Sequence, residues 1–176
     1  MQAGLKSGVV RQMKIRCSGS GDWERIWEIY AFARRVMRES GNPHQWSDNR
    51  PSAEAVQRDI DNGSSYVIED DGGRICGVFS FIIGDDPTYS YIEGGSWLND
   101  RPYGTLHRIA GDGTVKGLFR LIMDFCETRI SDIRIDTHGD NAIMRRLIEK
   151  NGFRYCGIIY VDDGTPRLAY HKSLNG

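Results

Sequence analysis

Hydrophobic positions along the chain recur with two periods, one typical of helices and one typical of strands. Apolar side chains at spacings of three and four predict a helix that begins at Asp22, and the same spacing predicts a helix over 141–151. Another helix is expected between Ser52, a good N-cap, and Gly63, and a further one behind the loop 111–117. The pattern therefore predicts four helices.

Runs rich in β-branched and aromatic residues, several of them alternating with polar residues, predict the strands. Glycine-bearing turns at 70–73 and 162–166 each lie between two such runs and indicate hairpins. Single strands are expected at 13–17, 105–110 and 132–138. The order of elements is β-α-α-β-β-β-α-β-α-β-β, which predicts a mixed sheet whose later strands alternate with helices.

The length of 176 residues suits one domain with its own core. We expect this domain at 13–176, with residues 1–12 as an N-terminal leader and Met13 as a candidate start. The 23 Lys and Arg residues nearly balance the 24 Asp and Glu residues, for a net charge of −1. No overall field therefore attracts nucleic acid or an anionic membrane, and no basic, aromatic face supports nucleic-acid binding.

Segments for export and residues for metal binding are not evident in the sequence. No stretch has the apolar core of a signal peptide or the length of a membrane span, so we expect a cytoplasmic protein. The cysteines have neither a CxxC pair nor a zinc-type Cys/His spacing. We expect reduced, buried or half-buried thiols and no metal site; the four residues are Cys17, Cys76, Cys126 and Cys156.

Glycines gather in the loop before the third predicted helix. Gly111, Gly113 and Gly117 let the backbone approach a ligand closely, and Lys116 adds a positive charge. The free N–H groups and the dipole of the following helix attract phosphate. The loop is therefore either a phosphate site or a plain turn.

A second strand-to-helix corner holds His138, Asp140 and Asn141. One capping residue is enough to begin a helix, so Asp140 or Asn141 is in excess, although adjacent polar residues are common at helix starts. His138 is either a surface histidine or a group that takes a proton from an incoming amine.

Both corners resemble those of the GNAT superfamily of N-acetyltransferases. The segment 107–119, HRIAGDGTVKGLF, falls where that superfamily has its pyrophosphate loop, and 140–153, DNAIMRRLIEKNGF, is similar to its Asn-x-x-(small or Met)…Gly-Phe motif. The resemblance covers nearly all of residues 13–172. It implies a GNAT-like α+β fold, with a mostly antiparallel sheet of about seven strands and helices on both faces.

The resemblance also implies where acetyl-CoA binds. Its pantetheine arm is expected between two splayed strands, near Asn141, and a backbone N–H at the end of the strand 105–110 is expected to stabilise the oxyanion. The cofactor-binding residues that the resemblance implies are Ile109, Ala110, Lys116, Gly117, Leu118, Asn141 and Met144.

Two positions depart from the superfamily. Its loop reads Arg or Gln, two residues, Gly, one residue, Gly or Ala, and here Phe119 stands in a position for a small residue. The acid of the superfamily is often a tyrosine four residues before the glycine of Gly-Phe, where this chain has Ile148.

Acetylation of an amine needs a base for the amine and donors for the oxyanion, and the thiolate that leaves can take a proton from an acid. The candidate bases are Glu93, His107 and His138. Glu93 is either a buried carboxylate beside aromatic rings or a solvated loop acid, and His107 either points into the cleft or is a core histidine. Tyr160 is a candidate acid, or it packs on the sheet.

In the fold that this chain resembles, the first helix, the loop after it and the segment before the fourth strand form the acceptor wall. Here these segments are aromatic and mildly acidic, which suits a cationic amine, although the tryptophans are equally consistent with loop anchors. The candidate acceptor-binding residues are Gln45, Trp46, Tyr91 and Trp97.

The sequence leaves two functions open. The first is an N-acetyltransferase that moves an acetyl group from acetyl-CoA to a primary amine of a small molecule or peptide, by direct transfer in a ternary complex. The second is a non-catalytic module on the same fold, which binds acyl-CoA or a protein partner. Many members of the superfamily pair as dimers, so a homodimer is one arrangement that the sequence leaves open.

Overall fold

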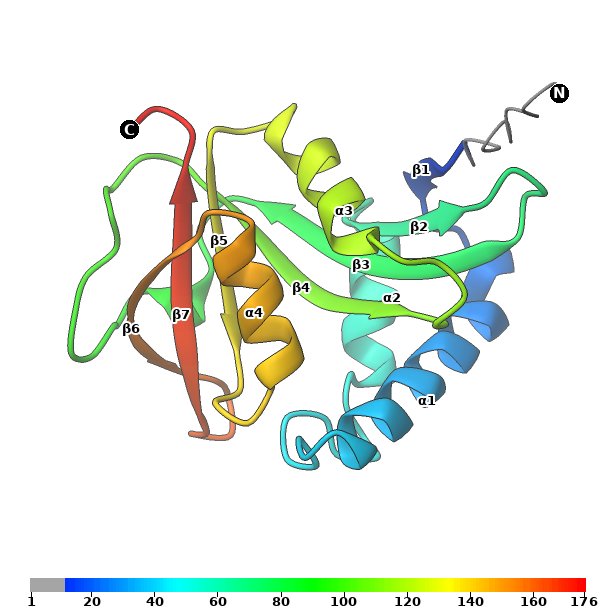
Figure 1. Ribbon diagram of the computed structural model, residues 1–176, viewed down its shortest axis with the longest axis horizontal. Coiled ribbons are helices and arrows are strands. Elements are labelled where there is room, and N and C mark those ends of the chain that lie inside the picture. The colour runs from blue at the N-terminus through cyan, green and yellow to red at the C-terminus, as the bar shows by residue number, and fades with distance from the viewer. Residues whose placement is uncertain (1–11) are drawn as a thin grey trace, which may run out of the picture.

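The computed structural model describes residues 12–176, which form one seven-stranded sheet with helices on both faces (Figure 1). Almost all of the expected leader 1–12 lies outside the described residues. The strands are β1 (Lys14–Cys17), β2 (Ser65–Glu69), β3 (Ile75–Ile83), β4 (Gly104–Gly111), β5 (Asp132–Thr137), β6 (Arg154–Tyr160) and β7 (Pro166–Ser173). The helices are α1 (Trp23–Glu39), α2 (Ala53–Asp61), α3 (Leu118–Glu127) and α4 (Ala142–Lys150), with short 3-10 turns at Ser20–Asp22 and Pro87–Tyr89.

The sheet has the order β1-β2-β3-β4-β5-β7-β6, and every neighbouring pair is antiparallel except β4 and β5. The expected fold class and order of elements are therefore confirmed. Both predicted hairpins are present, since β2 pairs with β3 and β6 pairs with β7.

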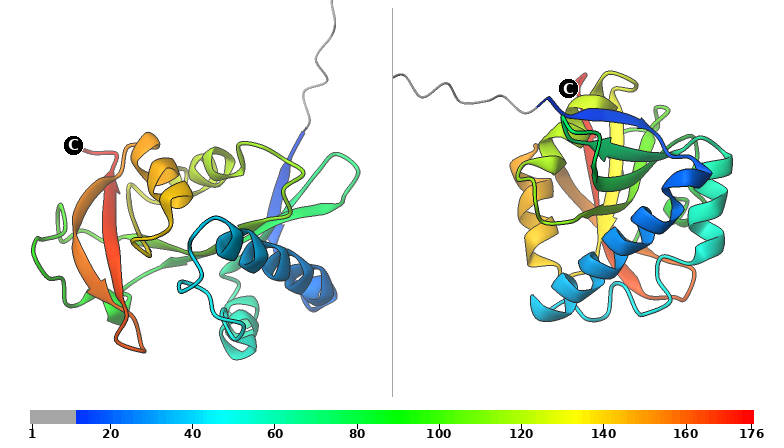
Figure 2. Two further views of the ribbon diagram at one scale, coloured as in Figure 1. Left: turned by 60° about the horizontal axis from the view of Figure 1, so that its bottom comes forward. Right: turned by 90° about the vertical axis from the view of Figure 1, so that its right-hand side faces the viewer.

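Two apolar layers hold the helices against the sheet. Helices α3 and α4 pack on one face, over a core that includes Phe79, Leu106 and Ile135. Helices α1 and α2 pack on the opposite face over Val67 and Val78 (Figure 2). Because side chains alternate along a strand, neighbours of these core residues in the sequence face the other layer.

Strands β4 and β5 separate soon after they meet. They pair only from Gly104 to Leu106, opposite Ile133 to Ile135, although β4 continues along β3 to Gly111 (Figure 1). Beyond this pairing the two strands run in different directions. Beyond Leu106 in β4 and Ile135 in β5, each strand therefore has no ladder partner on the side that faces the other strand.

A β-bulge in β4 lies at the start of the separation. Val78 of β3 is opposite Ala110 and Ser80 is opposite His107, so two residues of β4 lie opposite one residue of β3. Arg108, within the bulge, has a φ of 53°, in the left-handed region that non-glycine residues rarely adopt.

The cysteines are all free, and three of them are buried. Cys17 is exposed, so the expectation of a buried or half-buried thiol is wrong at this position, because β1 is short and lies at the edge of the sheet. Within residues 12–176, no helix has the length and apolar character needed to span a membrane.

Candidate active site

A cleft of about 610 Å³ lies where β4 and β5 separate. It passes from the side of α4 to the side of α2, because its wall includes residues of both helices. The lining comes from β4 (Leu106, His107, Arg108, Ile109), β5 (Ile135, Asp136), α4 and its cap (Asn141, Met144), the α1–α2 loop (Gln45, Trp46, Arg50), α2 (Arg58, Asp59), the segment 85–88, and the β6–β7 region (Val161, Asp162, Arg167).

Helix α3 begins at a glycine with no side-chain cap. Gly117 is the N-cap, with a φ of 79° in the left-handed region, and no side chain within residues 12–176 caps the helix start. The side chain of Phe119 is buried in the core under α3. The departure from the small-residue pattern therefore fills the core and leaves the helix start open. Lys116 beside it is exposed.

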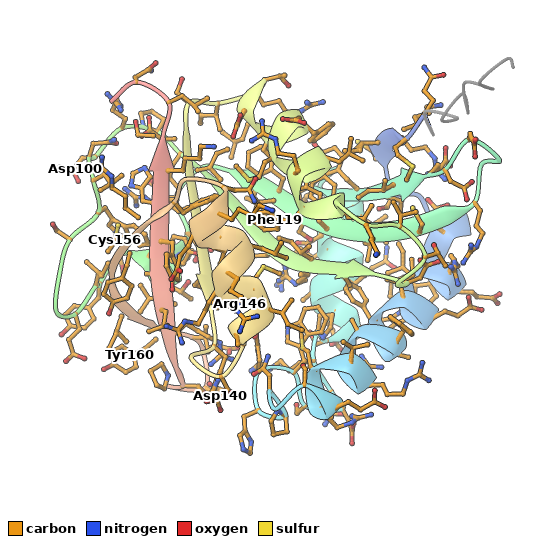
Figure 3. All side chains as sticks on the ribbon, in the orientation of Figure 1. Asp100, Phe119, Asp140, Arg146, Cys156 and Tyr160 are labelled. Carbon is orange, nitrogen blue, oxygen red and sulfur yellow. The ribbon has the colours of Figure 1, made fainter. Side chains whose placement is uncertain are left out.

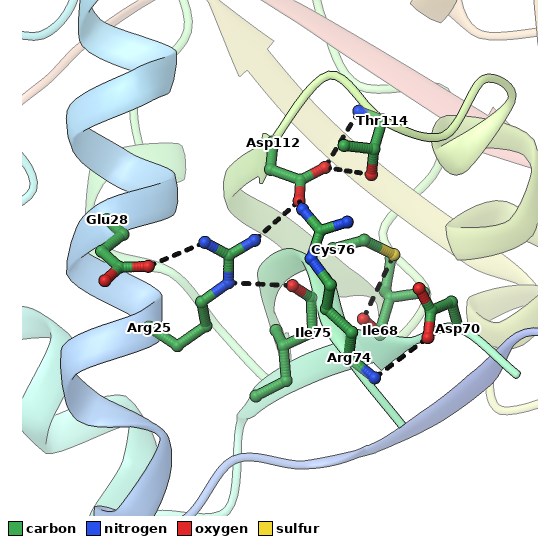
Figure 4. Close-up of polar contacts among 9 residues, drawn as sticks. All are labelled: Arg25, Glu28, Ile68, Asp70, Arg74, Ile75, Cys76, Asp112 and Thr114. Atoms are coloured by element: carbon green, nitrogen blue, oxygen red, sulfur yellow. Dashed lines mark hydrogen bonds and ion pairs between the residues drawn. The ribbon is translucent and has the colours of Figure 1, made fainter. Parts of the chain in front are cut away.

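The loop before α3 is held by one carboxylate. Asp112 accepts hydrogen bonds from Arg25 of α1 at 2.7 Å, from Arg74 of the β2–β3 hairpin at 2.5 Å, and from the N–H and hydroxyl of Thr114 (Figure 4). Burial raises the pKa of Asp112, but the bonds from Thr114 and the charges of Arg74 and Arg25 outweigh it and lower the pKa. The loop is thus tied to two other elements.

Two of the three polar residues at the corner before α4, His138 and Asn141, make hydrogen bonds through their side chains. Asn141 is the N-cap, since its side-chain oxygen accepts from Met144 N–H at 3.0 Å, and its amide donates to Gln45 Oε1 at 2.8 Å. His138 Nδ1 accepts from the N–H of Asp140, whose own side chain is exposed. His138 thus caps the turn before the helix, and Asn141 both caps α4 and joins it to the α1–α2 loop.

His107 and Asp86 form a pair inside the cleft. His107 Nε2 lies 2.7 Å from Asp86 Oδ2, and both side chains are half-buried. Burial raises the pKa of Asp86, but hydrogen bonds from His107 and Thr88 outweigh it and lower that pKa to about 2. A carboxylate that accepts from one imidazole nitrogen leaves the other free to take a proton.

A partly buried ion pair holds the bulge of β4. Arg108 donates to Asp59 of α2 at 2.8 Å, and Ser80 donates to the same carboxylate oxygen. Tyr30 of α1 donates to the carbonyl oxygen of Arg108. These contacts fix a backbone conformation that would otherwise be costly for a residue with a side chain.

Three candidate catalytic residues do not line this cleft. Glu93 and Tyr160 bond to each other, and Glu93 forms a β-bridge with Ile158, so both lie at β6. Figure 3 shows Tyr160 at this end of the sheet. His138 lies in the corner before α4, and burial, together with the charge of Arg167, lowers its pKa. Their catalytic roles stay predictions that the cleft does not support.

Of the four candidate acceptor-binding residues, two line the cleft and two do not. Gln45 and Trp46 line the cleft, and Trp46 also packs edge-on against Tyr30. Tyr91 is exposed. Trp97 lies 4.2 Å from the guanidinium of the buried Arg134 and donates to a backbone carbonyl, which is the arrangement of a loop anchor.

Several cleft residues were missed by the sequence analysis. Asp86 belongs to a polar segment 21 residues before its partner His107, and only its place before a proline indicates a capping role. Asp59 and Arg167 read as ordinary surface charges, because nothing local predicts that they are buried.

The chain matches the model of one protein family, the acetyltransferase (GNAT) domain, over residues 14–154. No curated protein matches it. Its fold is similar to a GNAT-family acetyltransferase of Streptococcus agalactiae, with a TM-score of 0.82 and 32% identity, covering 92% of this chain and 95% of the other. A GNAT-family acetyltransferase of Listeria monocytogenes has a TM-score of 0.68 at 21% identity, covering 92% and 95%.

A spermidine N-acetyltransferase of Vibrio cholerae, in complex with CoA and spermine, shares the fold, with a TM-score of 0.58 at 17% identity, covering 93% of this chain and 96% of the other. The family match spans most of the chain, and the separated strands and the open helix start agree with it. This chain belongs to the GNAT family of acetyltransferases.

Proposed function

We propose that this protein is an N-acetyltransferase that moves an acetyl group from acetyl-CoA to a primary amine of a small molecule or peptide, by direct transfer in a ternary complex. The observation that carries the proposal is the separation of β4 from β5 over a cleft that holds the His107–Asp86 pair. The proposal keeps a single domain over 13–176, a cytoplasmic location and a homodimer as predictions.

The residues around the separated strands fit acetyl-CoA. Strand backbone without ladder partners can bond the amides of a pantetheine arm, and the start of α3 can bind pyrophosphate. Acetyl-CoA supplies an activated acetyl thioester. In this proposal the arm lies by Ile109, Ala110 and Met144, and the pyrophosphate lies at Lys116, Gly117 and Leu118.

His107 is the proposed base. With Nε2–H donating to Asp86, Nδ1 takes a proton from the acceptor ammonium, and Asp86 stabilises the imidazolium that forms. The amine nitrogen then forms its bond to the acetyl carbon while the bond from that carbon to sulfur breaks. The amine nitrogen loses its second proton to solvent, and the leaving thiolate takes a proton from solvent. Ile148 is a core residue and provides no acid for this step.

The test measures release of CoA thiol from acetyl-CoA across a panel of primary amines. We expect turnover with some of them, and a fall in kcat of about 10²- to 10⁴-fold in His107→Gln, with CoA binding retained. His44→Gln, which changes an exposed histidine outside the cleft lining, is the control.

Two outcomes would count against the proposal. CoA binding without thiol release from any amine would favour the non-catalytic module. Turnover of His107→Gln at the wild-type rate would assign the base to another group.

A further inference from the structure

Arg167 provides an unused cationic site in the cleft. It lies at the start of β7, is 7% exposed and lines the cleft. Among the described residues, its guanidinium donates only to two backbone carbonyls, those of Pro166 at 3.1 Å and Gln45 at 3.4 Å. Its hydrogen bonds to described residues include no carboxylate, although a buried arginine normally has such a partner.

Two other pairs of ionisable groups in the cleft wall, each at least half-buried, are already formed. Arg108 binds Asp59, and His107 binds Asp86. At the rim, Arg50 binds Asp162. Arg167 is therefore the buried cleft arginine that makes no direct ion pair with a described carboxylate, although Asp136, Asp163 and Asp162 act on its charge from farther away.

Asp136 lies between His107 and Arg167 on one face of the sheet. Asp136 pairs with Ala169, two residues after Arg167, and alternation directs all three side chains to the same face. His107 of β4 is on this face too, since its neighbour Leu106 packs in the opposite layer. One oxygen of Asp136 accepts from the hydroxyl of Tyr89, and no described residue donates to the other.

His107, Asp136 and Arg167 thus lie side by side on three neighbouring strands, β4, β5 and β7. At one end His107 and Asp136 suit an ammonium group, and at the other Arg167 suits an oxyanion. A guanidinium has five donors in a planar fork and binds a carboxylate through two parallel hydrogen bonds. A polycation without a carboxylate would instead bring like charge to a desolvated arginine.

We infer that the acceptor is an amino carboxylate, such as a free amino acid, whose carboxylate binds Arg167 while its amine faces His107. This inference rests on the proposed function and deepens it. Burial lowers the pKa of Arg167, and the charges of Asp136, Asp163 and Asp162 raise it, which agrees with a guanidinium held out of water with carboxylates nearby but not in contact.

Matched acceptors test the inference in the wild-type protein. Thiol release is measured with L-amino acids and with their methyl esters, which keep the amine and side chain but lose the negative charge. We expect kcat/KM to be about 10-fold or more higher for the amino acids. The amine of an ester loses its proton more readily, so a slower ester cannot be explained by amine basicity.

Three outcomes of this comparison are distinct. Higher kcat/KM for the amino acids supports the inference. Turnover of esters and amino acids at equal kcat/KM overturns the inference and leaves the proposed function standing. No thiol release from any amine overturns the proposed function and the inference together.

Variants separate recognition from support of the fold. Arg167→Gln should lower kcat/KM for amino acids about 10- to 100-fold and leave the esters within about twofold, whereas Arg167→Lys should keep part of the preference. Arg154→Gln, at an exposed position of β6 outside the cleft lining, is the control with the same charge change.

If Arg167→Gln lowered kcat/KM equally for amino acids and esters while CoA binding stayed intact, the inference would be overturned. The role of Arg167 would then be to hold the α1–α2 loop through its bond to Gln45. If Arg167→Gln does not fold, the ester comparison and Arg167→Lys still decide.

Discussion

At the scale of single residues, Asp86 both stabilises the folded protein and orients His107, the proposed base. Its pKa is lowered from 3.8 to about 2 in the folded protein, because the hydrogen bonds from His107 and Thr88 outweigh its burial. A carboxyl whose pKa is lower in the folded state stabilises that state above its unfolded pKa, and this stability is lost as the pH falls through the folded pKa. The contribution at neutral pH is about 2 kcal/mol.

Asp86→Asn should therefore lower the free energy of unfolding by about 2 kcal/mol at pH 7 and by about half as much at pH 3, measured by urea denaturation. Asp85→Asn changes an exposed neighbour with no described ion pair and should shift the free energy by less than about 0.5 kcal/mol at either pH. If Asp86→Asn lowered the free energy of unfolding by the same amount at both pH values, the lowered pKa of Asp86 would be contradicted.

Residue roles were predicted from the sequence only where the local pattern determines them. Ser52 caps α2 as expected, because an N-cap bonds within its own first turn. The candidate base Glu93 and the candidate acid Tyr160 bond to each other at β6, outside the cleft lining, because a bridge to Ile158 holds Glu93 there. The partner of His107 depends on how residues 84–103 fold back over the sheet, and no short-range pattern encodes that path.

At the scale of elements, α4 depends on Asn141 for its first turn. The side chain has two separate functions, since its oxygen accepts from Met144 N–H and its amide donates to Gln45. Loss of an N-cap costs about 1 kcal/mol. Aspartate keeps the accepting oxygen and adds a charge that the helix dipole favours, but it cannot donate to Gln45.

We expect Asn141→Ala to lower the free energy of unfolding by about 1 kcal/mol and Asn141→Asp to stay within a few tenths of the wild type at pH 7. Urea denaturation of both variants measures the difference. An equal loss in both would show that the bond to Gln45, rather than the cap, supports this corner.

The order and types of the elements were predicted correctly, because each is encoded by a period of 3.6 or 2 and by its own turn residues. The bulge at Arg108 was not predicted. Its left-handed backbone is held by Asp59 of α2 and Tyr30 of α1, so its cause lies in tertiary contacts.

At the scale of the whole molecule, the sheet has two parts joined by a short parallel pairing. Strands β1–β4 form one part and β5–β7 the other, and the pairing between them covers only Gly104 to Leu106. The sequence alone could not show this, and the family resemblance supplied the expectation of separated strands. A ligand between β4 and β5 would bond the backbone of both parts.

CoA should therefore stabilise the molecule and protect the separated strands in particular. At 100 times its dissociation constant a ligand adds about 2.7 kcal/mol, which for a chain of this size raises Tm by about 5–10 °C. In hydrogen exchange we expect CoA to slow the peptides that cover 107–111 and 136–141 more than the β2–β3 hairpin, where the ladder is already complete. A rise in Tm with unchanged exchange in both segments would mean that CoA binds outside the separation of β4 and β5, because a ligand bonded to those strands must hinder the opening of their amides.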